Sequence, residues 1–374
     1  MRLLWIVRAD LERHPGGDTT QIHGTAKALR ELGHEVELTS DARPDFAGHD
    51  LVHLFHLDRL WENLPHARRL AAEGRPAVLS TIWWPSAEFD ARGRHGPQAW
   101  IARTFGARAY PTLKIAQRSC AAWLRSGLRR DQLPVLDFER AVGELLGAMR
   151  LLLPNSEAEA HEIEQRFGAR RLCRVVPNAA EGEFFTPGPE APRAGVVCVG
   201  RIEPRKNQLA LLEALRDSDV PVALVGRSGR FSAAYEKKCR RAAGPRVEFT
   251  GGLDREAVRE RLRRARVHVC PSWYETPGLA SLEAALCGCR IVVTPGGCTR
   301  EYFGGRALFV DPDDRTGLRD AVLRALEDPG ESEATSELRS RFSWEAAARA
   351  TAGAYAEALG SPAGAELHSS KAHL

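Results

Sequence analysis

Residues 267–294 read VHVCPSWYETPGLASLEAALCGCRIVVT, and this stretch decides the fold class. Its two ends, 267–270 and 291–294, are short apolar runs that predict buried strands. Residues 279–287 between them are apolar and long enough for a buried helix, and Gly278 permits a tight entry into it. A strand, a crossover helix and a second strand predict two parallel strands of one sheet.

The same alternation of short apolar runs and longer amphipathic segments continues along the chain. It predicts two series of strands: 3–7, 36–39, 51–54, 77–81 and 151–153, then 195–199, 222–225, 247–249, 267–270, 291–294 and 307–310. Proline- and glycine-rich residues 177–189 separate the two series. We therefore expect an α/β protein with two Rossmann-like, doubly wound domains, at 1–178 and 179–343, facing across a cleft.

Length, composition and charge narrow the function classes. The chain has 374 residues, enough for two domains, and its 43% hydrophobic and 27% charged residues exclude wholesale disorder. A net charge of +4 is too small to require nucleic acid. No apolar run is long enough for a transmembrane helix, and the first ten residues do not resemble a signal peptide. The eight cysteines form no C-x-x-C pair, which favours reduced thiols of a cytoplasmic protein over a zinc site.

Two carboxylates follow the strand at 267–270. Glu275 is expected on the loop at the carboxyl end of that strand, and Glu283 about one turn into the following helix. The two can flank one ligand at the mouth of the helix, where the free amides of Gly278, Leu279 and Ala280 would point toward an anion. An exposed helix glutamate is the alternative for Glu283, although the apolar residues around it make the helix look buried.

Two other loops follow strands in the same way. Arg201 and Lys206 lie between the strand at 195–199 and the next helix, and their cations suit phosphate oxygens. The alternative is a basic loop with solvated charges. Gly16 and Gly17 follow the first strand and begin a helix, so that backbone amides can approach a ligand closely. A plain turn is the alternative there.

These motifs resemble those of the family 4 retaining glycosyltransferases, which have the GT-B fold. Glu275 and Glu283 have the spacing of the E-x7-E motif of that family. Its usual pattern also matches the loop of Gly16 and Gly17 and residues 153–156, 176–178, 200–207, 288–297 and 308–314. The resemblance is dense over about 195–325 and looser over 1–180.

The resemblance implies transfer of a sugar from a nucleotide-diphosphate sugar to a hydroxyl acceptor, with retained anomeric configuration and no required metal or cofactor. Arg201 and Lys206 would hold the diphosphate. Glu283 would bind the ribose hydroxyls, and Glu275 would face the donor sugar. The loop of Gly17 would close over the phosphates from the first domain.

The resemblance also concerns the end of the chain and the protein's role. A final helix at 344–359 would pack back on the first domain, and the small, polar tail at 360–374 is expected to be disordered. A part in cell-surface polysaccharide or glycolipid assembly is expected, with a lipid-linked or saccharide acceptor. The alternatives are a catalytically silent nucleotide-sugar-binding scaffold and a nucleotide-sugar epimerase on the same fold.

The sequence departs from the family where many members carry a histidine after a first-domain strand. Residues 80–86 correspond to that place, and Trp83 and Trp84 stand there instead of a histidine. Their rings suit stacking on a sugar face, and core packing is the alternative. His53 and His56 lie at the end of another strand, either as ordinary structural histidines or as groups that reach the cleft.

A basic stretch lies at 86–135. It contains nine Lys or Arg but only three acidic residues, with Trp100, Tyr110 and Trp123 interleaved. Such a stretch suits peripheral attachment to the anionic inner face of a membrane, which agrees with a lipid-linked acceptor. A solvated helix face is the alternative. Nucleic acid is not expected as a partner, because no nucleic-acid-binding motif accompanies the charge.

Overall fold

A computed structural model describes residues 1–94, 112–113, 115–121, 123–124, 135–169, 172–188, 192–229, 232–276, 278–328 and 335–360. The chain divides into two compact units. Unit 1 consists of Met1–Trp83, Phe105–Asn178 and Trp344–Leu374, and unit 2 of Trp84–Thr104 and Ala179–Ser343. Among the described helices, none is long and apolar enough to cross a membrane.

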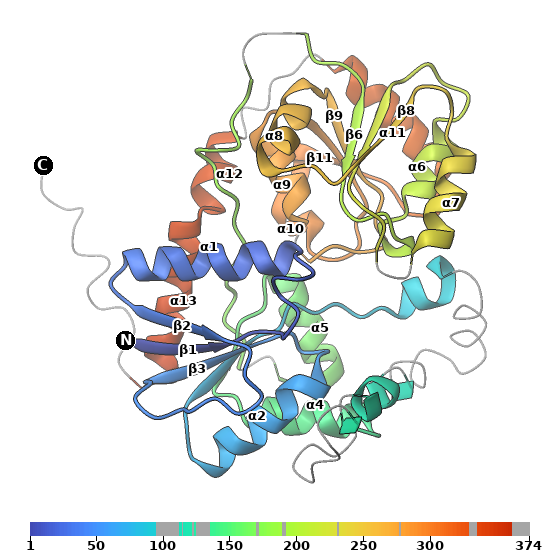
Figure 1. The fold of residues 1–374 in the computed structure, drawn as a ribbon. Helices are drawn as coiled ribbons and strands as arrows, with labels where there is room; N and C mark the ends of the chain where they lie inside the picture. Colours follow the sequence, from blue (N-terminus) through green and yellow to red (C-terminus); the bar gives the residue numbers. More distant parts are fainter. Residues whose placement is uncertain are drawn as a thin grey trace, which may run out of the picture. The chain divides into compact units, whose positions relative to one another are not determined.

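Five parallel strands form the sheet of unit 1, in the order β2-β1-β3-β4-β5 (Figure 1). The strands are β1 Arg2–Ile6, β2 Glu35–Thr39, β3 Leu51–Phe55, β4 Ala77–Ser80 and β5 Leu151–Leu152. Leu3 pairs with Val36 on one side and with Leu51 on the other. The inner strands are continuous apolar runs because helices cover both faces of the sheet.

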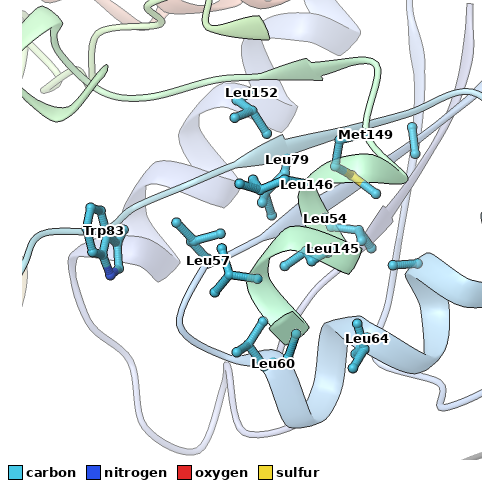
Figure 2. Packing of buried hydrophobic residues seen from close by; sticks show 14 of the residues in the cluster. Leu54, Leu57, Leu60, Leu64, Leu79, Trp83, Leu145, Leu146, Met149 and Leu152 are labelled. Atoms are coloured by element: carbon cyan, nitrogen blue, oxygen red, sulfur yellow. The ribbon is translucent and has the colours of Figure 1, made fainter. Parts of the chain in front are cut away.

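Helices cover both faces of this sheet, and alternate residues of each strand pack against different helices. They are α1 Gly17–Glu31, α2 Leu60–Ala72, α4 Phe138–Gly147, α5 Glu157–Phe167 and α13 Trp344–Ala358. Successive residues of a strand point to opposite faces. Leu3 and Trp5 therefore pack in the core with α1 and α13, and Leu4 and Ile6 in the core with α2 and α4. Figure 2 shows the second of these cores.

Six parallel strands form the sheet of unit 2, in the order β11-β10-β9-β6-β7-β8 (Figure 1). The strands are β6 Val196–Val199, β7 Val222–Val225, β8 Val247–Gly251, β9 Val267–Cys270, β10 Arg290–Val293 and β11 Ala307–Phe309. The strand that opens the second series, β6, lies at the centre, between β7 and β9. This places the loops that follow β6 and β9 next to each other at the carboxyl edge of the sheet.

The helices of unit 2 are α6 Gln208–Ala214, α7 Ala233–Ala242, α8 Arg255–Arg264, α9 Leu279–Leu286, α10 Thr299–Phe303, α11 Arg315–Glu327 and α12 Thr335–Arg341. Val196 and Cys198 pack in the core that contains α6, α7 and α11. Val197 packs in the core of the other face, with residues of α8, α9, α10 and α12. The central strand is thus buried on both sides, as its unbroken apolar sequence requires.

One short segment from the first half of the chain belongs to unit 2. Residues 84–94, which contain the helical turn η1 Phe89–Gly93, were expected in the first domain, and that expectation is wrong. The ring of Phe89 lies 6.4 Å from that of Trp273, and the guanidinium of Arg92 lies 2.5 Å from the carboxylate of Asp313. These contacts between residues far apart in the sequence assign the segment to unit 2. The local sequence pattern does not predict them.

The two doubly wound parallel sheets of the expected fold class are confirmed. Each strand begins and ends within two residues of its expected bounds. The final helix, α13, belongs to unit 1 and lies against α1, where the ring of Trp344 faces Gly24. The expected tail lies outside the described residues from 361 onward, and so does most of the basic stretch at 86–135.

The contact between α1 and α13 leaves no room for a side chain at Gly24. A Cβ atom there would lie 2.5 Å from the ring of Trp344. We expect Gly24→Ala to lower the free energy of unfolding by about 1–3 kcal/mol, because the added methyl group would force α1 and α13 apart. Urea unfolding followed by circular dichroism measures this change.

Gly353 in α13 is the matched control, because a Cβ atom there would meet no other atom within 4 Å. Gly353→Ala should raise the free energy of unfolding by up to about 1 kcal/mol, since alanine favours the helix. Equal effects of the two substitutions would contradict the close packing of α1 on α13.

Candidate active site

The carboxyl edge of the unit 2 sheet has its topological switch point between β6 and β9. The chain proceeds from β6 to β7 on one side, and β9 pairs with β6 on the other. Ligands of such sheets bind at the carboxyl ends of the strands on either side of a switch point. The loops that follow these two strands contain Lys206 and Glu275, which the sequence had singled out.

A buried ion pair joins the two loops. Lys206 Nζ donates a hydrogen bond to Glu275 Oε1 at 2.6 Å, and the guanidinium of Arg205 lies 3.7 Å from the same oxygen. The thiol of Cys270, the last residue of β9, lies 3.5 Å from it. Only 5% of Glu275 is exposed. The structure therefore brings together two residues that lie far apart in the sequence.

The pair determines the charge of Glu275. Burial alone would raise the pKa of this carboxyl group, but the charges of Lys206 and Arg205 outweigh burial and lower the pKa to about 2. Glu275 is therefore a carboxylate at neutral pH. It can balance positive charge and orient Lys206, but it has no proton to donate.

The backbone around Glu275 is held by the loop that follows β10. The Glu275 amide donates to the Gly296 carbonyl at 3.2 Å, and the Glu275 carbonyl accepts a hydrogen bond from the Cys298 amide at 2.9 Å. A Cβ atom on Gly297, whose φ is +88°, would lie 2.0 Å from the Glu275 carbonyl oxygen. Glycine is required at 297 because the two backbones approach so closely.

The loop that follows β6 also needs glycine. Gly200 has a φ of +151°, and a Cβ atom on Gly226, in the loop after β7, would lie 2.1 Å from the Gly200 carbonyl oxygen. The stem of Lys206 lies over Gly200, since a Cβ atom there would be 3.5 Å from Lys206 Cε. The bare backbone at 200 thus gives the lysine side chain its path toward Glu275.

Arg201 and Arg205 lie on this loop with different surroundings. The Arg201 side chain is 54% exposed, and its Nε lies 3.6 Å from Glu203 Oε2, so it remains available to an anion. Arg205 is tied down: it donates to the Tyr274 carbonyl at 2.9 Å, and its neighbouring anions raise its pKa despite burial. The sequence reasoning missed Arg205, although its place beside Lys206 is a signal that could have found it.

The helix α9 supplies the remaining candidate residues of this loop. Gly278, with a φ of +85°, precedes the helix, and its carbonyl accepts from the Ser281 amide at 2.9 Å. The amides of Gly278, Leu279 and Ala280 have no hydrogen-bond acceptor within the helix. Glu283 is half-buried, and burial raises its pKa to about 7, with Arg255 opposing the shift. In the part of the chain that the structure describes, no group pairs with its carboxylate.

The other candidate residues lie in unit 1. Gly16 caps α1, which begins at Gly17, and the Gly16 amide donates to Thr19 Oγ1 at 3.1 Å. Trp83 is 7% exposed and packs in the core with Phe167, so core packing is its role (Figure 2). Trp84 is partly buried against a core of unit 2.

His53 is a structural histidine. Its Nδ1 lies 2.6 Å from the hydroxyl of Tyr355, and its Nε2 lies 2.9 Å from the hydroxyl of Ser80. Burial lowers its pKa to about 3, so the ring is neutral. Both nitrogens are satisfied inside the core, which leaves none for a ligand.

The second half of the chain matches a known sequence family. The family described as glycosyl transferases group 1 matches residues 183–349, which include Arg201, Lys206, Glu275 and Glu283. This part of the chain is similar to that family. A D-inositol 3-phosphate glycosyltransferase of Kribbella flavida is 31% identical over 249 residues, which cover 58% of this chain and 59% of that protein. The match thus spans about three fifths of the length of that relative.

Solved structures resemble the fold of this chain. Sucrose-phosphate synthase from Thermosynechococcus elongatus superposes with a TM-score of 0.72 at 17% identity, covering 96% of this chain and 98% of that one. Anabaena Alr3699/HepE in complex with UDP-glucose superposes with a TM-score of 0.71 at 18% identity, covering 96% and 99%. These likenesses show the fold, which is GT-B. Among the residues described here, no three His, Cys, Asp or Glu side chains group as metal ligands.

The ion pair of Glu275 makes the stability of the protein depend on pH. A carboxyl whose pKa falls from 4.5 to about 2 on folding stabilises the protein above pH 4.5, and this stabilisation is lost as the pH falls toward 2. Glu275→Gln should therefore lower the free energy of unfolding by about 3 kcal/mol at pH 7, and by less at pH 3.5. Urea unfolding at the two pH values measures the difference.

Glu248→Gln is the control, because Glu248 pairs at 2.6 Å with Arg261 on the exposed surface of unit 2. Exposed pairs contribute only about 0–1 kcal/mol. If Glu275→Gln had the same small effect as Glu248→Gln at pH 7, the buried pair would not carry the energy assigned to it.

Proposed function

We propose that this chain is a retaining glycosyltransferase that moves a sugar from a nucleotide-diphosphate sugar to a hydroxyl of an acceptor. The observation that carries the proposal is the buried pair of Lys206 and Glu275 at the switch point of the unit 2 sheet. Arg201 adds an exposed cation on the same loop. Cations beside the free amides of a helix N-terminus suit a diphosphate.

In the proposed reaction, different residues at this edge of the sheet bind different parts of the donor. Lys206, Arg201 and the amides of residues 278–280 hold the diphosphate. Glu283, whose carboxylate has no partner among the described residues, accepts hydrogen bonds from the ribose hydroxyls. Glu275 faces the donor sugar as an anion and keeps Lys206 in place.

The bond changes follow from this arrangement. The bond from the sugar C1 to the phosphate oxygen breaks, and the acceptor oxygen bonds to C1 on the same face, so the anomeric configuration is retained. The acceptor proton passes to the departing phosphate oxygen. Negative charge grows on the diphosphate during this step, and cations and amides fixed in advance stabilise it.

The relatives support particular reagents for a first assay. The name of the Kribbella flavida relative includes D-inositol 3-phosphate, a polyol with several hydroxyls that can accept a sugar. The Anabaena structure holds UDP-glucose. We therefore propose UDP-glucose and D-inositol 3-phosphate as the first donor and acceptor to try, followed by GDP- and ADP-sugars and oligosaccharides.

The setting of the reaction is also a proposal. A cytoplasmic enzyme of cell-surface polysaccharide or glycolipid assembly would meet a lipid-linked acceptor at the membrane. The basic stretch at 86–135, which suits such a surface, lies mostly outside the described residues. A catalytically silent scaffold would bind the nucleotide sugar without consuming it, and turnover therefore separates the two readings.

Nucleotide binding should depend on Arg201. A nucleotide at a hundred times its Kd raises the free energy of unfolding by roughly 2.7 kcal/mol, which a thermal-shift assay detects. Arg201→Ala should weaken binding about tenfold or more, because it removes a charge-assisted hydrogen bond worth about 1.5–3 kcal/mol. The assay compares UDP, GDP and ADP with their glucose conjugates.

Arg246→Ala is a closely matched control for this experiment. The Arg246 side chain is 56% exposed and its Nε lies 3.7 Å from Asp219 Oδ1, much as Arg201 lies beside Glu203. Arg246, however, precedes β8 and so lies at the amino edge of the same sheet. Its loss should leave the nucleotide-induced shift unchanged. Equal losses in both variants would indicate unspecific charge attraction instead of a site.

Transfer should depend on Glu275 more than nucleotide binding does. Glu275→Gln should reduce transfer at least about 100-fold, since the anion beside the reacting sugar is lost, while the nucleotide-induced thermal shift persists. Lys206→Ala should weaken both, because Lys206 contacts the diphosphate. Product formation by mass spectrometry measures transfer. A Glu275→Gln variant that transfers sugar at the wild-type rate would refute the assignment of this residue.

A further inference from the structure

Unit 1 has a topological switch point of its own, and an unusual polar cluster occupies it. The strand β1 lies between β2 and β3 in this sheet. The chain continues from β1 to β2 on one side and then crosses to β3 on the other side. The segments that follow β1 and β3 therefore meet at the carboxyl edge, where ligands of such sheets bind. Arg8 and the start of α1 come from the first segment, and His56 from the second.

The centre of this cluster is a carboxylate held by a buried arginine. Arg8 is 9% exposed, and its Nε donates to Asp18 Oδ2 at 2.6 Å while a terminal nitrogen lies 3.3 Å from Asp18 Oδ1. Burial would raise the pKa of Asp18, but hydrogen bonds and charges from His56 and Arg8 hold it well below its usual range. Asp18 is therefore an anion that accepts hydrogen bonds and donates none.

His56 is held against this anion by a strained backbone. Its φ is +71°, in the left-handed region that residues other than glycine seldom adopt. The His56 amide donates to the Ser80 carbonyl at 2.9 Å, and Asn63 Nδ2 donates to the His56 carbonyl at 2.7 Å. Strain of this kind, maintained by surrounding hydrogen bonds, gathers at functional sites.

The hydrogen bond to Asp18 determines which ring nitrogen of His56 is free. His56 Nε2 lies 3.2 Å from Asp18 Oδ2, and because Asp18 only accepts, Nε2 carries the proton. Nδ1 is then the ring nitrogen that remains for a ligand. Within the described parts of the chain no group bonds to Nδ1, and the side chain is 13% exposed. His53, three residues earlier, has both nitrogens occupied.

We propose that His56, oriented by Asp18, binds the acceptor of the transfer reaction through a hydrogen bond between its Nδ1 and an acceptor hydroxyl. This inference rests on the proposed function and adds a residue of unit 1 to it. Other charged groups at this edge include Asp10, Arg59 and Glu62. Arg59 lies 3.4 Å from Asp10 and 2.6 Å from Glu62, and Asp10 also pairs with Arg8 at 2.9 Å. Since their charges pair among themselves, the cluster suits a neutral hydroxyl better than a second phosphate.

The test separates transfer from hydrolysis of the donor. The wild type and His56→Asn are assayed with the nucleotide sugar that gives the largest thermal shift, once with water alone and once with D-inositol 3-phosphate. Asparagine tolerates a positive φ, so the backbone remains unstrained by the change, but its side chain cannot reach as far. We expect kcat/KM for the acceptor to fall at least tenfold, while donor hydrolysis and the melting temperature change little.

His49→Asn is the matched control. His49 Nε2 also lies 3.2 Å from a carboxylate, that of Glu37, and the side chain is similarly buried, but His49 precedes β3 and lies at the opposite edge of the sheet. Its loss should not alter transfer. A second variant, His56→Gly, should regain acceptor transfer when imidazole is added, a rescue that a purely structural role does not predict.

The outcomes separate the two levels of inference. If the wild type transfers sugar and His56→Asn transfers it equally well, the role of His56 is refuted and the proposed function stands. Equal losses of hydrolysis and transfer, with a lower melting temperature and no rescue by imidazole, would make His56 a structural residue. A wild type that turns over no nucleotide sugar would refute the proposed function and this inference with it.

Discussion

A buried carboxylate cannot remain charged without partners, and the arrangement of the unit 2 edge follows from this constraint at Glu275. Lys206 and Arg205 supply the compensating charge from the neighbouring loop. Removal of one partner of a buried pair typically costs about 3–5 kcal/mol, because the other charge is left uncompensated. The loops after β6 and β9 are therefore fixed relative to each other. Gly297 is required because this fixed position brings two backbones into contact.

Each unit uses the same property of a parallel sheet with a different set of charges. The segments after the two strands at a switch point always meet at one edge, whatever residues they contain. In unit 2 they bring an excess of cations to one carboxylate, which suits a ligand that gains negative charge. In unit 1 they bring Arg8 and Asp18, whose charges compensate each other, and His56, whose Nδ1 has no partner among the described residues. The two edges thus differ in chemistry because the loops at the switch point of each sheet carry different side chains.

The sequence predicted the sheets well because buried parallel strands are unbroken apolar runs, such as Val196–Val199 and Val267–Cys270. It also pointed to Lys206 and Glu275, since loops after such strands carry the chemistry. It did not predict their direct contact, nor that burial would leave Glu275 with only 5% exposure, because side-chain direction depends on the tertiary fold. The left-handed backbone of His56 was equally hidden, since distant Asn63 and Ser80 impose it.

The charge of Glu275 constrains the path of the proton in the proposed reaction. With a pKa of about 2, Glu275 carries no proton at neutral pH to give to a leaving group, and the cations beside it make it a weak base. The acceptor proton must therefore go to another group. The departing phosphate oxygen gains basicity as its bond to C1 breaks, and it lies on the face from which the acceptor enters in a retaining reaction. An anion that stays charged throughout then has one remaining task, which is to stabilise positive charge on the sugar while Lys206 stabilises the phosphate.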